Sequence, residues 1–248
     1  MCTKHIGRTY RLARGAVNRL PGGAWLLGWT VHTHIANRLL RQALRERAGY
    51  ARGMLLDLGC GGQPYRHLFS HVDDYIGLDL PPNEVVDVYG DGMSLPFGDG
   101  VFDTVLCNEV LEHVPEPFSL LSEAARVLRP GGVLLLTAPQ TWGLHSEPHD
   151  FYRFTMYGLF YLAQKSGLEV LDVTPTSGFW ATFVQRLTDT IISNYVGGRS
   201  QWVTEVVSLL LAPLLVVGYG LDKVFGKRGD TLDHVMVARK PFRWPPFS

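Results

Sequence analysis

A glycine-rich turn and an acidic residue downstream of it carry the first chemical signal in this sequence. Residues 54–62 read Met-Leu-Leu-Asp-Leu-Gly-Cys-Gly-Gly, an apolar run that ends in three glycines within four residues. Glycine lets a backbone approach a ligand closely, because no Cβ atom intrudes. A second apolar run ends in Asp79, where a parallel sheet places a carboxylate that accepts hydrogen bonds from ribose hydroxyls. The two features together predict a nucleoside-binding site.

The spacing within this turn argues against a dinucleotide. Dinucleotide sites use Gly-x-Gly-x-x-Gly around a pyrophosphate. Here Asp57 precedes Gly59 and Gly61, and Pro64 stands where the third glycine would be. An acidic residue repels a pyrophosphate but suits a ligand with an ammonium group. S-adenosylmethionine, which carries an ammonium and a sulfonium group, is therefore favoured over a nicotinamide cofactor.

A second group of reactive residues lies in one loop after a predicted strand, where open parallel sheets bind their ligands. His149 is the candidate general base, because histidine titrates near neutrality, and Asp150 and Tyr152 are the other catalytic candidates. His145 and Arg153 are candidates for binding the substrate. Two alternatives stay open: Arg153 pairs internally with Asp150 or Glu147, and Tyr152 packs beneath the loop. No metal site is predicted, because Pro148 separates His145 from His149 and prevents the helix on which both would bind one ion.

The hydrophobic pattern of the sequence predicts the fold that positions these residues. Short apolar runs that alternate with helical patterns predict βαβ units, hence an α/β fold with a doubly wound, mostly parallel sheet and helices on both faces. The predicted strands are 54–58, 75–80, 101–107 and 133–138, and the predicted helices are 30–47 and 117–128. Pro130-Gly131-Gly132 is expected to end the second helix and turn the chain into the next strand.

At this point the sequence resembles the class I S-adenosylmethionine-dependent methyltransferases, in particular the small-molecule branch related to the methyltransferase type 11 domain. The resemblance covers residues 54–140 and rests on six ordered motifs: 56–61, 77–79, 90–97, 102–107, Leu-Glu-His-Val at 111–114 and Arg-Val-Leu-Arg-Pro-Gly-Gly at 126–132. It implies a Rossmann-like, seven-stranded sheet of order 3-2-1-4-5-7-6 with the seventh strand antiparallel. Residues 233–239 suit that last strand.

The resemblance also implies which residues bind the cofactor. They line the carboxyl ends of the first, second and fourth strands: Asp57, Gly59, Cys60, Gly61, Asp79, Leu80, Asp91, Gly92, Met93, Asn108 and Glu109. Asp79 would take the ribose hydroxyls, Asp91 the adenine amine, and Glu109 would border the transferred methyl. Simpler roles stay open, since Asp91 suits a turn, Cys60 suits a buried unreactive thiol, and His113, a further substrate-binding candidate, suits a packed histidine.

The charge balance and the cysteine content indicate which partners and which location to expect. Lysine plus arginine and aspartate plus glutamate both count 23, so the sequence predicts no nucleic-acid partner. Three unpaired cysteines indicate a reducing, cytoplasmic location, and the arginines among the first 30 residues do not suit a signal peptide. Residues 1–53 hold ten lysines and arginines against one acidic residue, so a basic helical N-terminal extension is expected before the methyltransferase core at 54–173.

The C-terminal part, 174–248, contains an apolar helical insertion at about 203–225 and the last strand. Its 16 uncharged residues, 206–221, fall short of the roughly 20 that span a bilayer, and Pro213 interrupts them. A buried hairpin, a dimer or lid interface, a membrane-surface or re-entrant segment at the inner face of the membrane, and a spanning helix are the alternatives. The predicted function is methyl transfer to a hydroxyl or carbon of a small or lipid-linked acceptor by a monomer or homodimer. An S-adenosylmethionine-binding module without turnover is the alternative.

Overall fold

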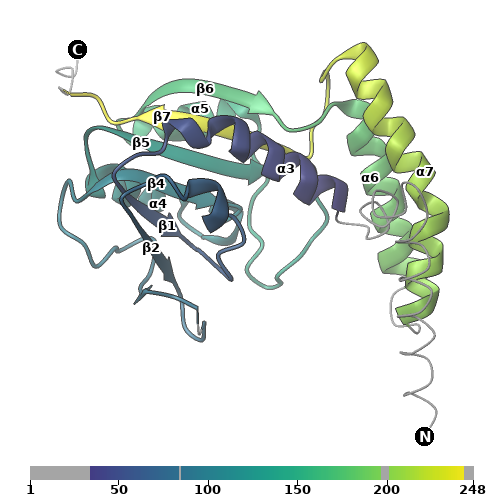
Figure 1. Ribbon diagram of the computed structural model, residues 1–248, viewed down its shortest axis with the longest axis horizontal. Helices are drawn as coiled ribbons and strands as arrows, with labels where there is room; N and C mark the ends of the chain where they lie inside the picture. Colours follow the sequence, from purple (N-terminus) through teal and green to yellow (C-terminus); the bar gives the residue numbers. More distant parts are fainter. Residues whose placement is uncertain (1–33, 84, 197–200, 243–248) are drawn as a thin grey trace, which may run out of the picture. The chain divides into compact units, whose positions relative to one another are not determined.

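The computed structural model describes residues 34–83, 85–196 and 201–242, and the chain divides into two compact units (Figure 1). The sheet unit comprises residues 40–176 and the described residues from 232, and the helix unit comprises described residues before 40 and between 177 and 231. The helices and short turns of helix are α3 (His34–Arg47), η1 (Ala48–Tyr50), η2 (Arg66–Phe69), η3 (Leu111–His113), α4 (Pro117–Val127), α5 (Met156–Lys165), α6 (Phe179–Ile191), η4 (Ile192–Val196) and α7 (Gln201–Phe225). The strands are β1 (Met54–Leu58), β2 (Asp74–Asp79), β3 (Val88–Tyr89), β4 (Phe102–Asn108), β5 (Leu128–Pro139), β6 (Glu169–Pro175) and β7 (Asp233–Arg239).

The sheet has the predicted topology. Its seven strands run in the order β3-β2-β1-β4-β5-β7-β6, and β7 is antiparallel to both of its neighbours while the other pairs are parallel. The predicted α/β class, strand order and antiparallel last strand are thus confirmed. Because β1, β2 and β4 are parallel neighbours, their carboxyl ends meet at one edge. That edge carries the glycine turn, Asp79 and Asn108.

Helices cover both faces of this sheet, as the alternating pattern predicted. On one face, leucines of α4 such as Leu120 and Leu121 pack with Leu56 and Leu58 of β1, all of them buried. On the other face, Leu44 of α3 packs with β1 and β4. Successive β1 residues point to alternate faces, so the strand is buried on both sides and reads as a continuous apolar run.

The junction between α4 and β5 differs from the prediction. α4 ends at Val127 and β5 begins directly at Leu128, so Pro130, Gly131 and Gly132 belong to the strand and do not form the expected turn before it. The extra residues are absorbed as a register shift against β4, between Phe102 and Thr104. Gly131, at φ 81°, adopts a backbone conformation that glycine tolerates best.

The helix unit contains α6 and α7, which run side by side (Figure 1). The expectation that Pro213 interrupts the apolar segment is wrong, because α7 continues through it as one helix of 25 residues. A proline removes one intrahelical hydrogen bond, and the rest of a long helix can persist around it. Within α7, Val206–Phe225 is long and apolar enough to cross a membrane, by length and composition alone. A hairpin within 206–221 is thereby excluded.

Candidate active site

The glycine turn and Asp79 are joined by a hydrogen bond. The backbone amide of Gly61 donates to Asp79 Oδ2 at 2.8 Å, and Gly59 and Gly61 have φ angles of 72° and 51°. A Cβ atom on Gly59 would lie 2.4 Å from Val110, so only glycine fits there. A Cβ atom on Gly61 would meet no described atom within 4 Å beyond its chain neighbours. The turn therefore leaves open space beside a carboxylate, which suits the ribose and methionine portions of a nucleoside cofactor.

Asp57 lies in β1, two residues before the first glycine of this turn. Its buried carboxylate accepts a hydrogen bond of 2.5 Å from the Tyr75 hydroxyl. Burial, with a smaller contribution from Asp79, raises the pKa of Asp57 to about 6. The structure thus ties the Asp57 carboxylate to Tyr75 of β2.

Cys60 lies in the same turn as a buried thiol. Burial, together with the charges of Asp57 and Asp79, raises its pKa to about 12. Cys107 is buried in β4 and its pKa is also raised, mainly by burial. A thiol held protonated is a poor nucleophile, so both cysteines fit the unreactive alternative.

The predicted adenine edge has an exposed apolar residue and a polar turn. Leu80, directly after β2, is 60% exposed, which suits a side chain that stacks on a ligand. Asp91 Oδ1 accepts the backbone amide of Met93 at 2.8 Å, so Asp91 does form the turn considered as its alternative. Gly92 packs tightly, since a Cβ atom there would lie 3.1 Å from Leu120. The turn and a ligand contact are compatible, because Asp91 is exposed.

Asn108 and Glu109 end β4 beside the glycine turn. Thr137 holds both, donating its hydroxyl to Asn108 Oδ1 and accepting the backbone amide of Glu109. Glu109 has a φ of 53°, unusual for a residue with a side chain, and its Oε1 atom is buried without a hydrogen-bond partner among the described residues. Burial raises the pKa of Glu109 to about 7. A buried acceptor without a partner suits a cationic ligand group.

Two further buried carboxyl groups near Glu109 were missed by the sequence analysis. Glu112 in η3 has no exposed side-chain surface and Asp233 opens β7 as a buried residue. Burial, followed by the charge of Glu109, raises the pKa of both. The spacing Glu109-x-x-Glu112-His113 was a visible signal for Glu112. No local sequence pattern indicated Asp233. It comes near the other carboxyl groups only because β7 pairs with β5 in the folded sheet.

The loop after β5 is closed by an internal ion pair. Arg153 donates to both carboxylate oxygens of Asp150, at 2.7 and 2.8 Å, and to the carbonyl oxygens of Trp142 and Gly143. Asp150 also accepts the backbone amide of His145. These hydrogen bonds hold the pKa of Asp150 well below its usual range, with Arg153 the main cause. The internal alternative for Arg153 describes the structure, and Asp150 orients Arg153 and His145, not His149.

The remaining candidates lie on the outer side of this loop. His149 is exposed, and its ring packs near Phe151 at 6.3 Å between centroids. The Tyr152 hydroxyl donates to the Pro115 carbonyl oxygen. His113 Nδ1 lies 2.6 Å from the His149 carbonyl oxygen, and the His113 and His145 rings are 4.7 Å apart. The structure therefore brings His113, His145 and the His149 backbone together next to Glu112.

Known methyltransferases resemble this chain in sequence, and solved structures resemble it in fold. The family described as "Methyltransferase domain" matches residues 56–136. A ubiquinone biosynthesis O-methyltransferase of Thiobacillus denitrificans is 29% identical over 66% of this chain and 84% of its own length. The 27-O-demethylrifamycin SV methyltransferase of Amycolatopsis mediterranei is 35% identical over 46% and 49%, respectively. Among solved structures, the [4+2]-cyclase SpnF has a TM-score of 0.55 at 22% identity, covering 82% of this chain and 81% of its own.

The strand order, glycine turn and acidic end of β2 define a class I S-adenosylmethionine-dependent methyltransferase fold, as the resemblance implied. The matched methyltransferase domain, residues 56–136, runs from β1 into β5. An uncharacterised methyltransferase of Mycobacterium leprae matches at 35% identity over 34% of this chain. The chain spans only 36% of that relative's length.

Proposed function

We propose that this protein transfers a methyl group from S-adenosylmethionine to a hydroxyl, or to an activated carbon, of a small or lipid-linked molecule. The observation that carries the proposal is the family match over β1 to β5 together with the Gly61–Asp79 hydrogen bond at the carboxyl edge of the sheet. Two named relatives, the ubiquinone biosynthesis O-methyltransferase and the rifamycin methyltransferase, favour an oxygen as the acceptor atom.

The described residues fit the cofactor. Gly61 leaves room for a close approach, Leu80 offers an exposed apolar surface, and Glu109 holds a buried acceptor without a partner among the described residues. When bound, S-adenosylmethionine supplies a methyl group on a positively charged sulfur, ready for displacement. A nearby cation would favour the ionised form of Glu109, which burial alone disfavours.

The rest of the chemistry is positioning and proton removal. His149 is exposed at the edge of the site and can take the proton of an acceptor hydroxyl as its oxygen attacks. Arg153 and Asp150 hold the loop together through their ion pair, so their role is to fix the loop and not to orient the His149 ring. Tyr152 anchors the same loop to Pro115 through its hydroxyl. A carbon acceptor that forms its own enolate would need less help from His149.

Native mass spectrometry of the full chain, followed by product analysis, tests the proposal. We expect retained S-adenosylmethionine or its demethylated product, and transfer of an isotope-labelled methyl group to a component of a small-molecule and lipid extract. Binding without transfer to any fraction would favour the alternative of a binding module. The fold allows that alternative, since SpnF, which has a similar fold, is a [4+2]-cyclase. No cofactor binding by the folded chain would contradict both.

We also propose that the helix unit contacts a membrane, which suits a lipid-linked acceptor. Apolar side chains on α6 and α7 are exposed, among them Phe183 at 51%, Leu210 at 72% and Val217 at 57%, and only 28% of the most apolar window of α7 is buried. The same helices also bury polar side chains: Thr182, Gln185, Thr188, Ser208 and Asp222. Apolar surface facing outward and polar groups facing inward suit a lipid environment.

The ten basic residues among 1–53, which include residues outside the described structure, would add attraction to anionic lipids of the inner leaflet. Co-sedimentation with anionic and neutral vesicles at low and high salt tests this second proposal. We expect binding to both, with the anionic preference lost at high salt because salt screens the charges. No sedimentation with either vesicle would contradict membrane contact and favour a dimer or lid interface.

A further inference from the structure

A buried carboxyl group, that of Glu112, lies beside His113 in the sheet unit and has no hydrogen-bond partner among the described residues. The Glu112 side chain is fully buried, and neither of its carboxyl oxygens has a hydrogen-bond partner among the described residues. Its Oε1 atom lies 3.7 Å from His113 Nε2. Leaving a buried polar group without a partner costs about 1–3 kcal/mol, and more if it is charged. Such a group in a folded protein indicates a missing partner such as an ion.

The hydrogen bonding of His113 leaves its second nitrogen available. His113 Nδ1 lies 2.6 Å from the His149 carbonyl oxygen, which can only accept, so Nδ1 carries the hydrogen and donates it. In the neutral ring, Nε2 then has a lone pair that faces Glu112. Metal-binding histidines are held in this way, with the other ring nitrogen donating to a carbonyl or carboxylate.

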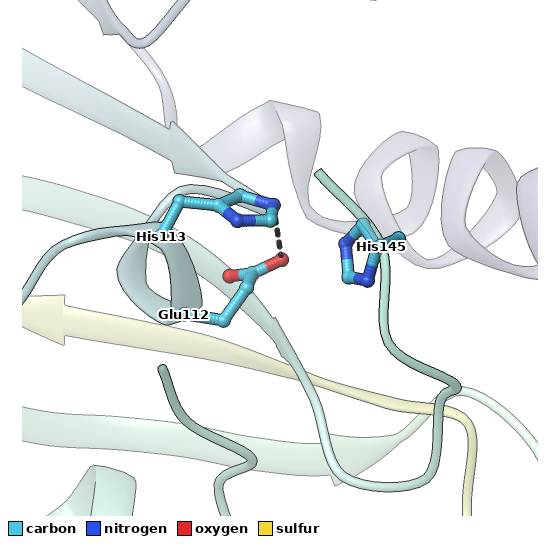
Figure 2. A group of neighbouring side chains, drawn as sticks. All are labelled: Glu112, His113 and His145. Carbon is cyan, nitrogen blue, oxygen red and sulfur yellow. Dashed lines mark ion pairs between the residues drawn. The ribbon is translucent and has the colours of Figure 1, made fainter. Parts of the chain in front are cut away.

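A third ligand comes from a distant part of the sequence. His145, in the loop after β5, faces Glu112 and His113, which come from the single turn η3 (Figure 2). One ligand atom from each of the three residues lies within 4.8 Å of the other two. Two ligands on a tetrahedral ion at about 2.1 Å stand ~3.4 Å apart. Movement of about 1 Å by His145, whose side chain is 33% exposed, would complete such a set.

The surrounding charges favour a cation at this position. The Arg153 guanidinium lies 3.4 Å from His145 Nδ1, but its charge is balanced by two hydrogen bonds to Asp150. Glu109 and Asp233 add further buried carboxyl groups that interact electrostatically with Glu112.

We propose that Glu112, His113 and His145 bind one divalent first-row transition-metal ion at the carboxyl edge of the sheet. Two imidazoles and one carboxylate are a donor set that suits such ions. Three protein ligands leave a coordination position open, as in catalytic metal sites. That position would take the oxygen of an acceptor hydroxyl, a role that rests on the proposed function, whereas metal binding does not. The sequence analysis paired His145 with His149 and therefore predicted no metal.

Metal titration of the full chain tests this site without an activity assay. The protein is freed of metal with a chelator, then titrated with Co²⁺, followed by visible absorption, and with Zn²⁺, followed by calorimetry. We expect one ion per chain, and a loss of affinity of about 100-fold or more in Glu112→Gln, His113→Ala and His145→Ala. The matched control is His67→Ala, an exposed histidine of η2 outside the cluster, which should bind like the wild type.

The outcomes separate this inference from the proposed function. No metal binding by the folded wild type, or unchanged affinity in folded ligand variants, overturns the metal site, and a proton shared by His113 and Glu112 then explains their approach. His145→Ala alters the most exposed ligand, so it remains informative if Glu112→Gln does not fold. Methyl transfer without metal binding overturns only the metal site. Metal binding without cofactor binding overturns only the proposed function.

Discussion

The two units of this chain differ in the mixture of side chains that they bury and expose. In the sheet unit, leucines such as Leu56 and Leu120 are fully buried, and the reactive polar groups gather at one edge of the sheet. In the helix unit, Gln185 and Asp222 are buried while Leu210 is 72% exposed. Asp222 accepts hydrogen bonds from the backbone amides of Gly178, Trp180 and Ala181, so it caps α6 from α7. The same chain thus follows two packing patterns.

The difference shows what each unit is adapted to contact. Water drives apolar side chains inward, so the sheet unit has the pattern of a protein that folds around its own core. The helix pair instead joins its helices through small and polar groups, for example where Gly218 approaches the backbone of Trp180. Helices in lipid associate in this way, because apolar contact with lipid has no cost. The chemistry and the proposed membrane contact are therefore assigned to separate units, and each can be altered alone.

The largest effect is expected from a substitution that lowers methyl transfer and leaves membrane binding unchanged. We predict that His149→Ala lowers turnover by about 10²–10⁴-fold, because an acceptor hydroxyl loses its general base, with cofactor affinity and vesicle binding unchanged. Labelled methyl transfer to the acceptor identified in the extract, across a pH series, measures this. His67→Ala serves as the control histidine. Equal turnover at every pH would show that the base lies elsewhere or is not needed.

Matched leucines compare the two packing patterns directly. We predict that Leu120→Ala, at a fully buried position, lowers the free energy of unfolding by about 2–5 kcal/mol, because it leaves a cavity. Leu210→Ala, at a position 72% exposed, should change it by less than about 0.5 kcal/mol in the absence of lipid. Urea denaturation measures both. Equal destabilisation would mean that α7 is packed against another surface in solution.

The buried carboxyl group of Asp57 gives the sheet unit a pH dependence. Its pKa in the folded state is raised to about 6 from 3.8, so folding favours the protonated form. Its contribution to stability is fully present below about pH 4 and is lost as the pH rises to about 6, a change of about 3 kcal/mol. Asp57→Asn should remove this loss. Urea midpoints from pH 4 to 7 measure it, with the exposed Asp73→Asn as control; parallel curves for the wild type and Asp57→Asn would contradict the assignment.

A smaller effect is expected at the cofactor edge of the sheet unit. We predict that Asp79→Ala weakens S-adenosylmethionine binding by about 1–3 kcal/mol, because the ribose loses an ionised acceptor and Gly61 loses its hydrogen bond. Calorimetry measures the affinity. Asp79→Asn, which keeps the size of the side chain, separates charge from shape. Unchanged affinity in a folded Asp79→Ala protein would remove this residue from the site.

The smallest expected effect concerns the exposed face of the helix unit. We predict that Val217→Ser weakens vesicle binding by about 1 kcal/mol, roughly fivefold, because less apolar surface enters the lipid. Vesicle co-sedimentation measures this. Tyr161→Ser, at a similarly exposed position on α5 of the sheet unit, is the matched control and should bind like the wild type. An equal loss of vesicle binding in both variants would contradict the proposal that only the helix unit contacts the membrane.

The sequence predicted most of the sheet because its signals are local. A buried strand reads as an apolar run, and β1, β2, β4 and β7 lie within one residue of their predicted limits. The sequence did not predict that Pro213 lies inside α7 or that Pro130 lies inside β5. Whether a proline is tolerated depends on neighbours that are distant in the sequence. Propensity describes a residue alone, whereas a long helix or a paired strand can absorb one unfavourable residue.

By itself, the sequence determined the class of fold, the glycine turn and the acidic end of β2, since each depends on residues close together in the chain. Only the tertiary structure decided which reactive groups meet. It turned Arg153 onto Asp150 and left His149 exposed, and it set Glu112 and His113 opposite His145, more than thirty residues away. Burial, which shifts the protonation of Glu112, is likewise a property of the folded protein. Contacts across a sheet edge arise from strand order, and no local pattern encodes them.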